Sequence, residues 1–235
     1  MAQGQINQCI ATTAFMTRQP PSSSLLRITE LFVSLQGEAE QMGWPTAFIR
    51  LTGCPLRCQY CDTAYAFHGG TLMELSHIIE TVKTERVRYV CVTGGEPLAQ
   101  KNCLALLKQL CNAGFHVSLE TSGALAIDAV DPRVSRVVDL KTPGSGEVDR
   151  NLWQNLAVLN PHDQLKCVIC NEEDYHWAHH LVLDKQLHRR CSVWFSPSHG
   201  QIAPTLLADW IVRDRLPVRF QLQLHKLLWN DGPGR

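Results

Sequence analysis

Residues 54–61 read Cys54-Pro-Leu-Arg-Cys58-Gln-Tyr-Cys61, with cysteines separated by three residues and then by two. A structural zinc ion or an ordinary iron–sulfur cluster takes four protein ligands, so this set is one short. Three thiolates so close together can bind three irons of a cubane cluster and leave the fourth iron open to a small molecule. The alternative is a zinc site with a distant fourth ligand such as His68, although zinc sites usually combine two separated pairs of ligands.

The composition is that of a globular protein. The chain has 235 residues, of which 45% are hydrophobic and 19% charged, and its net charge is zero. Zero net charge gives no electrostatic reason to expect nucleic acid or an anionic membrane as a partner. No apolar run approaches the roughly 20 residues of a membrane span. The ten cysteines are irregularly spaced, which argues against a disulfide framework and indicates a reducing cytoplasm.

Residues 1–24 are predicted to be a disordered N-terminal extension. They are polar and end in Pro20-Pro-Ser-Ser-Ser24, a run typical of loops, and Met16 is an alternative start. The extension lacks the pattern of a signal peptide. No linker or internal repeat interrupts the remainder, so residues 25–235 are expected to form a single domain.

Beyond residue 24, short β-rich runs alternate with segments of helical period. This alternation predicts an α/β fold with a parallel sheet or a partial barrel. The connection after the third strand is short, so a helix there is expected to be degenerate. Strands are expected at 46–52, 89–93, 116–121, 136–140, 164–169, 192–196 and 218–224, and helices at 72–85, 102–113, 151–159, 175–187 and 204–213.

Cys167 and Cys170 could form a second metal or redox site. The favoured interpretation is a buried strand over residues 164–170. Residues three apart on a strand point to opposite faces, so the two thiols are expected to diverge.

Polar motifs follow most of the predicted strands at their carboxyl ends. Parallel α/β folds place their active face at this edge of the sheet. The cysteine loop follows the first strand, and five further motifs lie at 93–97, 120–123, 139–141, 196–199 and 225–226. The convergence of six loops predicts one large active site.

The interpretation of the motif Thr93-Gly-Gly-Glu-Pro97 depends on the motifs that accompany it. Two glycines let the backbone approach a ligand closely, and Glu96 can accept a hydrogen bond from a cationic amine. Alone, the motif is consistent with an ordinary turn. Beside a three-cysteine loop, we interpret it as the site that binds the amino group of S-adenosylmethionine.

Together these motifs resemble those of radical S-adenosylmethionine enzymes, whose hallmark is Cys-x3-Cys-x2-Cys followed one strand later by Gly-Gly-Glu-Pro. Within that superfamily, residues 26–229 resemble the 7-carboxy-7-deazaguanine synthase family. The resemblance implies a partial (β/α)6 TIM-like barrel of the radical S-adenosylmethionine type. The matching stretches are Ser34-Leu-Gln-Gly-Glu38, Phe48-Ile-Arg-Leu51, Gly53-Cys-Pro55, Cys61-Asp-Thr63, Thr93-Gly-Gly-Glu-Pro97, Glu120-Thr-Ser-Gly123 and Gln223-Leu-His-Lys226.

The resemblance also implies a 4Fe–4S cluster on Cys54, Cys58 and Cys61, with S-adenosylmethionine at the fourth iron. The reduced cluster would cleave this cofactor to methionine and a 5′-deoxyadenosyl radical. Asp139-Leu-Lys141 departs from the Ser-Pro-Lys that is common in the family, so only Lys141 carries over. The residues expected to hold the cofactor are Tyr60, Asp62, Gly95, Glu96, Ser122, Lys141, Ser196, Pro197, Ser198 and His199.

The implied substrate is 6-carboxy-5,6,7,8-tetrahydropterin, which would be converted to 7-carboxy-7-deazaguanine with ring contraction and loss of ammonia. This is a step of queuosine and deazapurine biosynthesis. A carboxylate such as Glu38 can accept paired N–H bonds from a guanine-like edge, and Arg50 can bind a carboxylate with two bonds. A strand-end salt bridge for Arg50 and a structural role for His225 remain open. The residues expected to bind the substrate are Leu35, Gln36, Gly37, Glu38, Arg50, Thr93 and His225.

Thr63 matches the position at which the family binds Mg²⁺ through a hydroxyl, with waters and substrate oxygens completing the octahedron. A reductant such as flavodoxin or ferredoxin and a homodimer are the other implied partners. Two departures lie at Ala39, where glycine is frequent, and after His225, where some members end and place a terminal carboxylate on the substrate.

Two other functions remain as alternatives. A radical enzyme that activates a protein would share the cysteine loop, but residues 35–38 and 61–63 favour a pterin and Mg²⁺. A non-enzymatic metal-binding or electron-transfer module would have no use for six converging loops.

Overall fold

The computed structural model describes residues 24–230 and residue 234. Apart from Ser24, the extension predicted for residues 1–24 lies outside the described residues. Within the described part of the chain, nine strands form one sheet in the order β3-β1-β2-β4-β5-β6-β7-β8-β9. Their bounds are β1 Leu25–Leu35, β2 Pro45–Leu51, β3 Thr71–Glu74, β4 Tyr89–Gly94, β5 His116–Thr121, β6 Ser135–Asp139, β7 Gln164–Ile169, β8 Ser192–Pro197 and β9 Arg219–Phe220.

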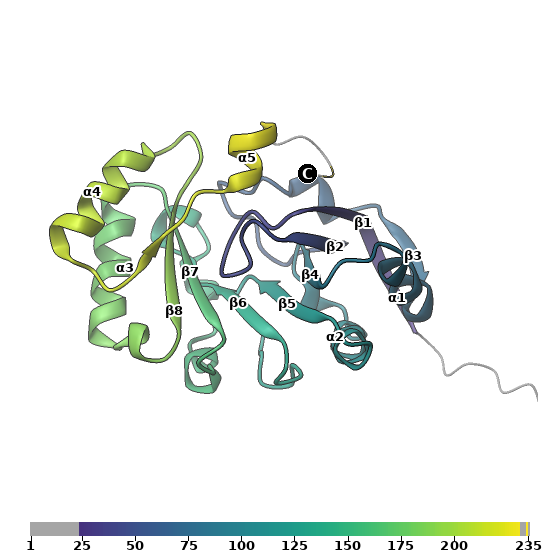
Figure 1. The fold of residues 1–235 in the computed structure, drawn as a ribbon. Coiled ribbons are helices and arrows are strands. Elements are labelled where there is room, and N and C mark those ends of the chain that lie inside the picture. The colour runs from purple at the N-terminus through teal and green to yellow at the C-terminus, as the bar shows by residue number, and fades with distance from the viewer. Residues whose placement is uncertain (1–23, 231–233, 235) are drawn as a thin grey trace, which may run out of the picture.

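The sheet is parallel from β2 through β4 to β9, and only its β1 edge is antiparallel, where β1 pairs with β2 and β3. Each of four α-helices leads into a parallel strand. They are α1 Leu75–Thr84 before β4, α2 Cys103–Asn112 before β5, α3 Glu172–Asp184 before β8 and α4 Pro204–Asp214 before β9. Figure 1 shows these helices on the outer side of the curved sheet, while α5 (Leu224–Trp229) lies on the opposite side. The predicted partial barrel is confirmed.

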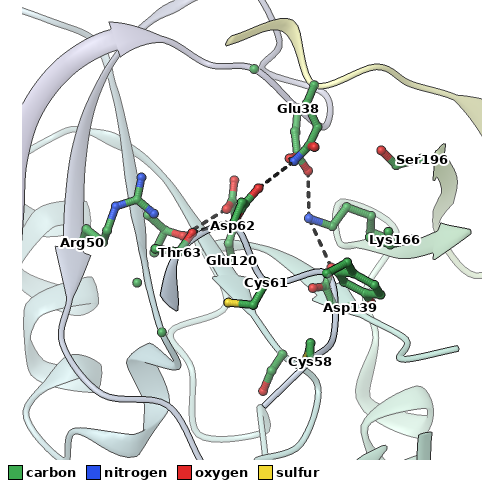
Figure 2. Close-up of a pocket in the computed structure, with 18 of the residues that line it drawn as sticks. Glu38, Arg50, Cys58, Cys61, Asp62, Thr63, Glu120, Asp139, Lys166 and Ser196 are labelled. Atoms are coloured by element: carbon green, nitrogen blue, oxygen red, sulfur yellow. Dashed lines mark hydrogen bonds and ion pairs between the residues drawn. The ribbon is translucent and has the colours of Figure 1, made fainter. Parts of the chain in front are cut away.

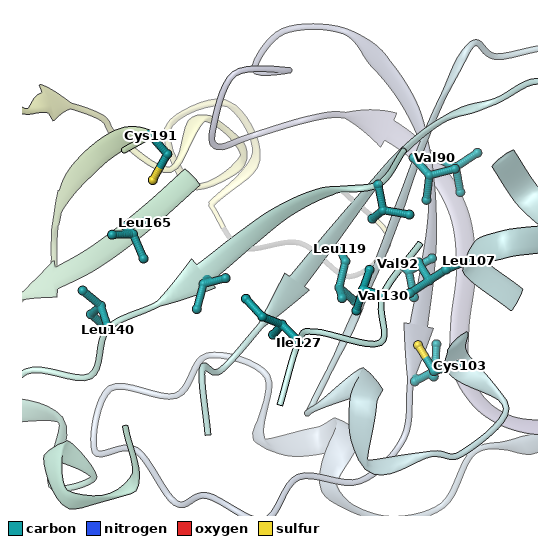
Figure 3. Packing of buried hydrophobic residues seen from close by; sticks show 14 of the residues in the cluster. Val90, Val92, Cys103, Leu107, Leu119, Ile127, Val130, Leu140, Leu165 and Cys191 are labelled. Carbon is teal, nitrogen blue, oxygen red and sulfur yellow. The ribbon is translucent and has the colours of Figure 1, made fainter. Parts of the chain in front are cut away.

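The core lies between the sheet and the outer helices. Strands buried on both faces are continuous apolar runs, and Val90, Cys91 and Val92 of β4 are fully buried in this way. Figure 3 shows Val92 near Leu119 of β5 and Leu107 of α2, and all three belong to one buried cluster with Val90. The outer face of the sheet is therefore occupied by the apolar core, and the polar motifs lie away from it, around the cavity.

Several predicted elements differ from the observed ones. The strands β1 and β3 were not predicted, and the expected helix at 72–85 begins with β3 before continuing as α1. The expected helix at 151–159 is a 3-10 segment, η5 (Trp153–Val158). The last expected strand, 218–224, is reduced to the two residues of β9, because the chain turns there to enter α5.

The connection from β5 to β6 contains no α-helix, as predicted, and hydrogen bonds take the place of helix packing. Asn155 donates to the carbonyl oxygens of Gly123 (3.1 Å) and Leu125 (2.9 Å). Arg136 at the start of β6 donates to the carbonyl oxygens of Ile127 (3.0 Å) and Val158 (2.8 Å) and forms a buried two-bond ion pair with Asp163. These contacts hold the amino ends of β6 and β7 together.

The strand interpretation of Cys167 and Cys170 is supported. Cys167 lies in the apolar core, whereas Cys170 follows the end of β7, where its N–H donates to Asp174 (2.9 Å). Burial raises the pKa of the Cys167 thiol, as expected for a thiol that acts as a small hydrophobic group. Among the described residues, no helix combines the length and apolar character that crossing a membrane requires.

Candidate active site

A cavity of about 710 Å³ opens at the carboxyl ends of the parallel strands. Figure 2 shows Glu38 reaching into it from one side, Cys58 and Cys61 from the opposite side, and Arg50 and Ser196 from the flanks. All six predicted loops contribute to the lining, so the predicted convergence of motifs is observed. The predicted site residues that line the cavity are Leu35, Gln36, Gly37, Glu38, Arg50, Cys54, Cys58, Tyr60, Cys61, Asp62, Thr63, Thr93, Gly95, Ser122, Lys141, Ser196, Ser198, His199 and His225.

Two predicted cofactor residues, Glu96 and Pro197, are not among the residues that line the cavity. Glu96 is fully buried, and its carboxylate accepts hydrogen bonds from the backbone N–H of Leu98 (2.9 Å) and Ser122 (2.7 Å) and from Thr121 Oγ1 (2.9 Å). Glu96 therefore holds the loop after β5 against the loop after β4. Its contact with a ligand amine stays a prediction.

The cysteine loop is fixed by backbone contacts at both of its ends. Gly53 N–H donates to the Ala66 carbonyl (2.8 Å), and Glu96 N–H donates to the Gly53 carbonyl (2.8 Å). A Cβ atom at Gly95 would lie 2.3 Å from the Gly53 carbonyl oxygen, so only glycine permits this approach. The Gly-Gly-Glu loop therefore packs directly on the backbone that begins the cysteine loop.

The three cysteines fit a cluster better than a single ion. All three are half-buried and line the cavity, and burial raises the pKa of Cys54 and Cys58. In the described part of the chain, no group of three or more His, Cys, Asp or Glu side chains is arranged to hold one metal ion. The ligands of a cubane cluster bind separate irons and need no common centre. His68, the alternative zinc ligand, is exposed and outside the cavity lining.

The loop at residues 36–39 is shaped by its own side chains and by the C-terminal segment. Gln36 Oε1 accepts hydrogen bonds from the N–H groups of Gly37 (2.8 Å) and Glu38 (3.3 Å). A Cβ atom at Gly37 would lie 2.4 Å from Nδ1 of His225, so these residues are in close contact. Ala39 keeps a left-handed φ of 62°, and its replacement of the frequent glycine therefore does not require a different backbone conformation here.

Arg50 forms the salt bridge that its sequence left open and also lines the cavity. Its Nε donates to Glu30 (2.8 Å), which also accepts from the Tyr65 hydroxyl (3.0 Å). Its guanidinium carbon lies 5.8 Å from the ring centroid of Phe32 and 5.9 Å from that of Tyr65. Arg50 is thus both part of a salt bridge and a cationic wall of the cavity.

A chain of four charged side chains crosses the cavity wall. Lys166 Nζ lies 2.7 Å from Glu38 Oε2 and 3.3 Å from Asp139 Oδ1 (Figure 2). Lys141 Nζ lies 2.7 Å from Asp139 Oδ2. Burial alone would raise the pKa of Glu38 and Asp139, but the neighbouring ammonium groups outweigh it and lower both pKa values. The carboxylates therefore stay ionised inside the protein.

Glu120 behaves differently from these two carboxylates. It lines the cavity, accepts a hydrogen bond from Thr93 Oγ1 (3.0 Å) and contacts Gln36 Nε2 (3.4 Å). Burial raises its pKa, with repulsion from Glu38 in the same direction, and the Lys166 charge does not cancel these effects. The cavity is therefore lined by two carboxylates with a lowered pKa, Glu38 and Asp139, and by one carboxyl group with a raised pKa, Glu120.

The C-terminal segment 221–226 connects the loop at 36–39 to the cysteine loop. Gln223 Nε2 donates to Glu38 Oε1 (2.8 Å) and lies 3.4 Å from Asp62 Oδ2. Lys226 Nζ lies 2.8 Å from Asp62 Oδ2, and this ion pair helps to lower the pKa of Asp62 against the effect of burial. Thr63 Oγ1 donates to the other Asp62 oxygen (2.8 Å).

Lys166 and Glu120 were not predicted as site residues, although the sequence contains a signal for one of them. Lys166 lies between the fully buried Leu165 and Cys167 of β7, and a single charged residue inside an apolar strand needs a partner. Its partner Glu38 lies 128 residues earlier in the chain, so the pair could not be identified before the folded structure was known.

The chain is similar in sequence to several proteins. A model of the Radical SAM superfamily matches residues 48–136. A 7-carboxy-7-deazaguanine synthase of Chlorobaculum tepidum is 47% identical over 208 residues, which cover 87% of this chain and 94% of that protein. A protein of the same name from Methanospirillum hungatei is 37% identical over 227 residues, which cover 96% and 94% of the two chains.

Solved structures share the fold at lower sequence identity. QueE from Escherichia coli has a TM-score of 0.68 at 23% identity, covering 86% of this chain and 96% of that chain. SuiB from Streptococcus suis, in its complex with S-adenosylmethionine, has a TM-score of 0.53 at 14% identity, covering 76% and 51%. Both agree with the partial barrel described above.

Proposed function

Because the chain belongs to the 7-carboxy-7-deazaguanine synthase family of radical S-adenosylmethionine enzymes, we propose that it converts 6-carboxy-5,6,7,8-tetrahydropterin to 7-carboxy-7-deazaguanine with loss of ammonia. The observation that carries this proposal is one cavity lined by the cysteine loop, the loop at 36–39 and Arg50. A cluster, a cofactor and a bicyclic substrate with a carboxylate would each meet suitable groups there.

The cluster and cofactor fit the residues present. Three half-buried thiols supply cluster ligands, and the close approach of Gly95 to Gly53 brings a glycine backbone beside them. When bound, the reduced cluster and S-adenosylmethionine supply a 5′-deoxyadenosyl radical by one-electron cleavage of the sulfonium. Ten residues are proposed to hold the cofactor in place, of which all but Glu96 and Pro197 line the cavity: Tyr60, Asp62, Gly95, Glu96, Ser122, Lys141, Ser196, Pro197, Ser198 and His199.

The substrate groups have complementary partners on the other side of the cavity. Arg50, fixed by Glu30 and two aromatic rings, is proposed to bind the substrate carboxylate. Glu38 is ionised and is proposed to accept N–H bonds from the pterin edge, with Leu35, Gln36 and Gly37 forming the same wall. Thr93 and His225 are proposed as further contacts. The partly enclosed site limits contact with water during radical chemistry.

Magnesium is proposed to bind at Thr63. The Thr63 hydroxyl lines the cavity beside the ionised carboxylate of Asp62, and oxygen groups are the ligands that Mg²⁺ prefers. One protein oxygen would leave the remaining positions to water and to the substrate. The carboxylate of Asp62 is already paired with Lys226, which supports a role for Thr63 rather than Asp62 as the direct ligand.

Three further proposals concern the electron donor, the oligomeric state and the location of the protein. A flavodoxin- or ferredoxin-like reductant would supply the electron at the partly exposed cysteine loop. A homodimer would cover exposed apolar side chains such as Val212 and Leu227, which are 75% and 69% exposed. A cytoplasmic location is supported by the cysteines of the described part of the chain, all of which are unpaired. Sedimentation of the purified protein tests the dimer.

Anaerobic turnover tests the proposed reaction. The protein is reconstituted with iron and sulfide, reduced, and supplied with S-adenosylmethionine, Mg²⁺ and the carboxytetrahydropterin. We expect 7-carboxy-7-deazaguanine in the product mixture. Formation of 5′-deoxyadenosine without this product would reject the proposed substrate and favour a radical enzyme that acts on another molecule.

A further inference from the structure

Lys166 contacts the proposed substrate-binding carboxylate, although it belongs to none of the six predicted motifs. We propose that Lys166 is a positioning residue, which holds the Glu38 carboxylate ionised and oriented toward the substrate and connects it through Asp139 to Lys141. This inference rests on the proposed function. It adds to that function a residue that acts through Glu38 and need not touch the substrate.

The placement of Lys166 follows from the period of β7. Leu165 and Cys167 are fully buried and Cys167 packs in the core, so the residue between them points to the other face of the sheet, which is the cavity face. The Lys166 side chain is 12% exposed, and its ammonium group lies between Glu38 and Asp139. Such a buried ammonium group requires partners of opposite charge.

The contacts of Glu38 explain why this lysine matters for binding. Glu38 Oε2 accepts from Lys166 (2.7 Å) and, at 3.3 Å, from Gln221, while Oε1 accepts from Gln223 (2.8 Å). A carboxylate offers about four acceptor positions, so these three donors fix its orientation and leave room for a substrate N–H. Of the three donors only Lys166 is charged, and without it a buried Glu38 would take up a proton and lose acceptor capacity.

The second partner of Lys166 links the two halves of the cavity. Asp139 accepts from Lys166 through one oxygen and from Lys141 through the other. Lys141 Nζ lies 5.8 Å from the ring centroid of Tyr60. Tyr60 lies between Cys58 and Cys61 in the sequence. Four alternating charges therefore run from the substrate side to the cofactor side. Figure 2 shows Lys166 between the carboxylates of Glu38, from the loop at 36–39, and Asp139, from the end of β6.

The test compares Lys166→Met with Lys83→Met, because each removes one lysine–glutamate pair with an N–O distance of 2.7 Å. The Lys83–Glu80 pair is on the exposed side of α1, where Lys83 is 48% exposed. Pterin affinity is measured by titration calorimetry on reconstituted but unreduced enzyme with S-adenosylmethionine present, so no turnover occurs. Steady-state kinetics on reduced enzyme give kcat and KM separately.

We expect Lys166→Met to raise the pterin Kd and KM by about 10- to 100-fold, the loss typical of a hydrogen bond to a charged group. The effect on kcat at saturating pterin should be smaller, and cluster absorbance should be unchanged. Lys166→Arg, which keeps the charge, should recover most of the affinity. Lys83→Met should leave the Kd unchanged.

A double-mutant cycle with Glu38→Gln separates positioning from a general structural effect. If Lys166 acts through Glu38, adding Lys166→Met to Glu38→Gln should change the Kd by less than about twofold. Effects that multiply in the double variant, or a Kd for Lys166→Met equal to that of Lys83→Met, would overturn the inference. Should Lys166→Met fail to fold, Lys166→Gln serves in the same cycle. A wild-type enzyme that forms no 7-carboxy-7-deazaguanine would instead refute the proposed function.

Discussion

The pairing of β6 with β7 carries buried charges at both ends, and the two ends differ in what these charges face. At the amino end, Arg136 and Asp163 bind each other, and Arg136 also binds two backbone carbonyl oxygens outside the cavity lining. At the carboxyl end, Asp139 and Lys166 belong to a chain of charges that lines the cavity.

The difference shows that burial of an ion pair does not by itself mark a functional site. Burying two charges costs about as much free energy as pairing them returns, so stability alone explains neither of the two buried ion pairs. At the amino end, the reason is the helix-free connection between β5 and β6, which Arg136 holds in place. At the carboxyl end, charges remain available to a ligand.

The largest expected effect separates function from fold at the carboxyl end. Cys58→Ala should abolish turnover and the visible absorbance of the cluster, because the remaining two thiols cannot hold three irons. Near-native circular dichroism is expected, since Cys58 is not part of the apolar core. Cys111→Ala, which removes a half-buried thiol outside the cavity lining, is the matched control and should keep its cluster. Full activity in Cys58→Ala would remove the cluster assignment.

The amino end should respond in stability instead. Asp163→Asn leaves the buried Arg136 without its counter-charge and should lower the free energy of unfolding by about 3–5 kcal/mol, measured by urea denaturation. The pair Arg133–Asp131 has the same two-bond geometry, but its arginine side chain is 49% exposed, so Asp131→Asn is the control and should have a smaller effect. Equal losses in both variants would mean that burial does not distinguish the pairs.

A smaller effect is expected at the proposed magnesium ligand. Thr63→Ala removes one hydroxyl oxygen from the cavity and should reduce kcat/KM by about 10-fold or more at limiting Mg²⁺, as for the loss of one ligand or its supporting contact. Raising the Mg²⁺ concentration should recover part of the activity. Turnover of the wild-type enzyme that is indifferent to Mg²⁺ would remove Thr63 as a ligand and leave it as a partner of Asp62.

The smallest effect concerns the pH dependence of stability at Glu120. Burial raises its pKa above the ordinary value of 4.5, so the native state binds this proton more tightly than the unfolded chain does. Glu120 therefore lowers stability as the pH rises through the interval above 4.5. Glu120→Gln should unfold at a higher temperature than the wild type near pH 7, with a gain that shrinks toward about pH 4. A gain that is independent of pH would contradict the raised pKa.

The parallel core of the fold could be predicted from the sequence, because its strands are apolar runs followed by polar loops. The antiparallel edge could not, since β1 is only partly buried along much of its length and lacks the continuous apolar pattern. Motif positions identified most of the cavity lining. Local sequence did not show that Glu96 accepts hydrogen bonds from Thr121 and Ser122, because these partners come from the next loop. Lys166 escaped for the same reason, since its partners are distant in sequence.

The segment 221–226 has a consequence for the order in which the enzyme becomes active during its synthesis. Its residues bind Glu38, Asp62 and the backbone of Gly37, all of which leave the ribosome much earlier. A nascent chain can therefore form most of the sheet while its cavity still lacks this wall. Shortened chains that end before residue 221 would keep the cysteine loop but lose Gln223 and Lys226, which join it to the loop at 36–39.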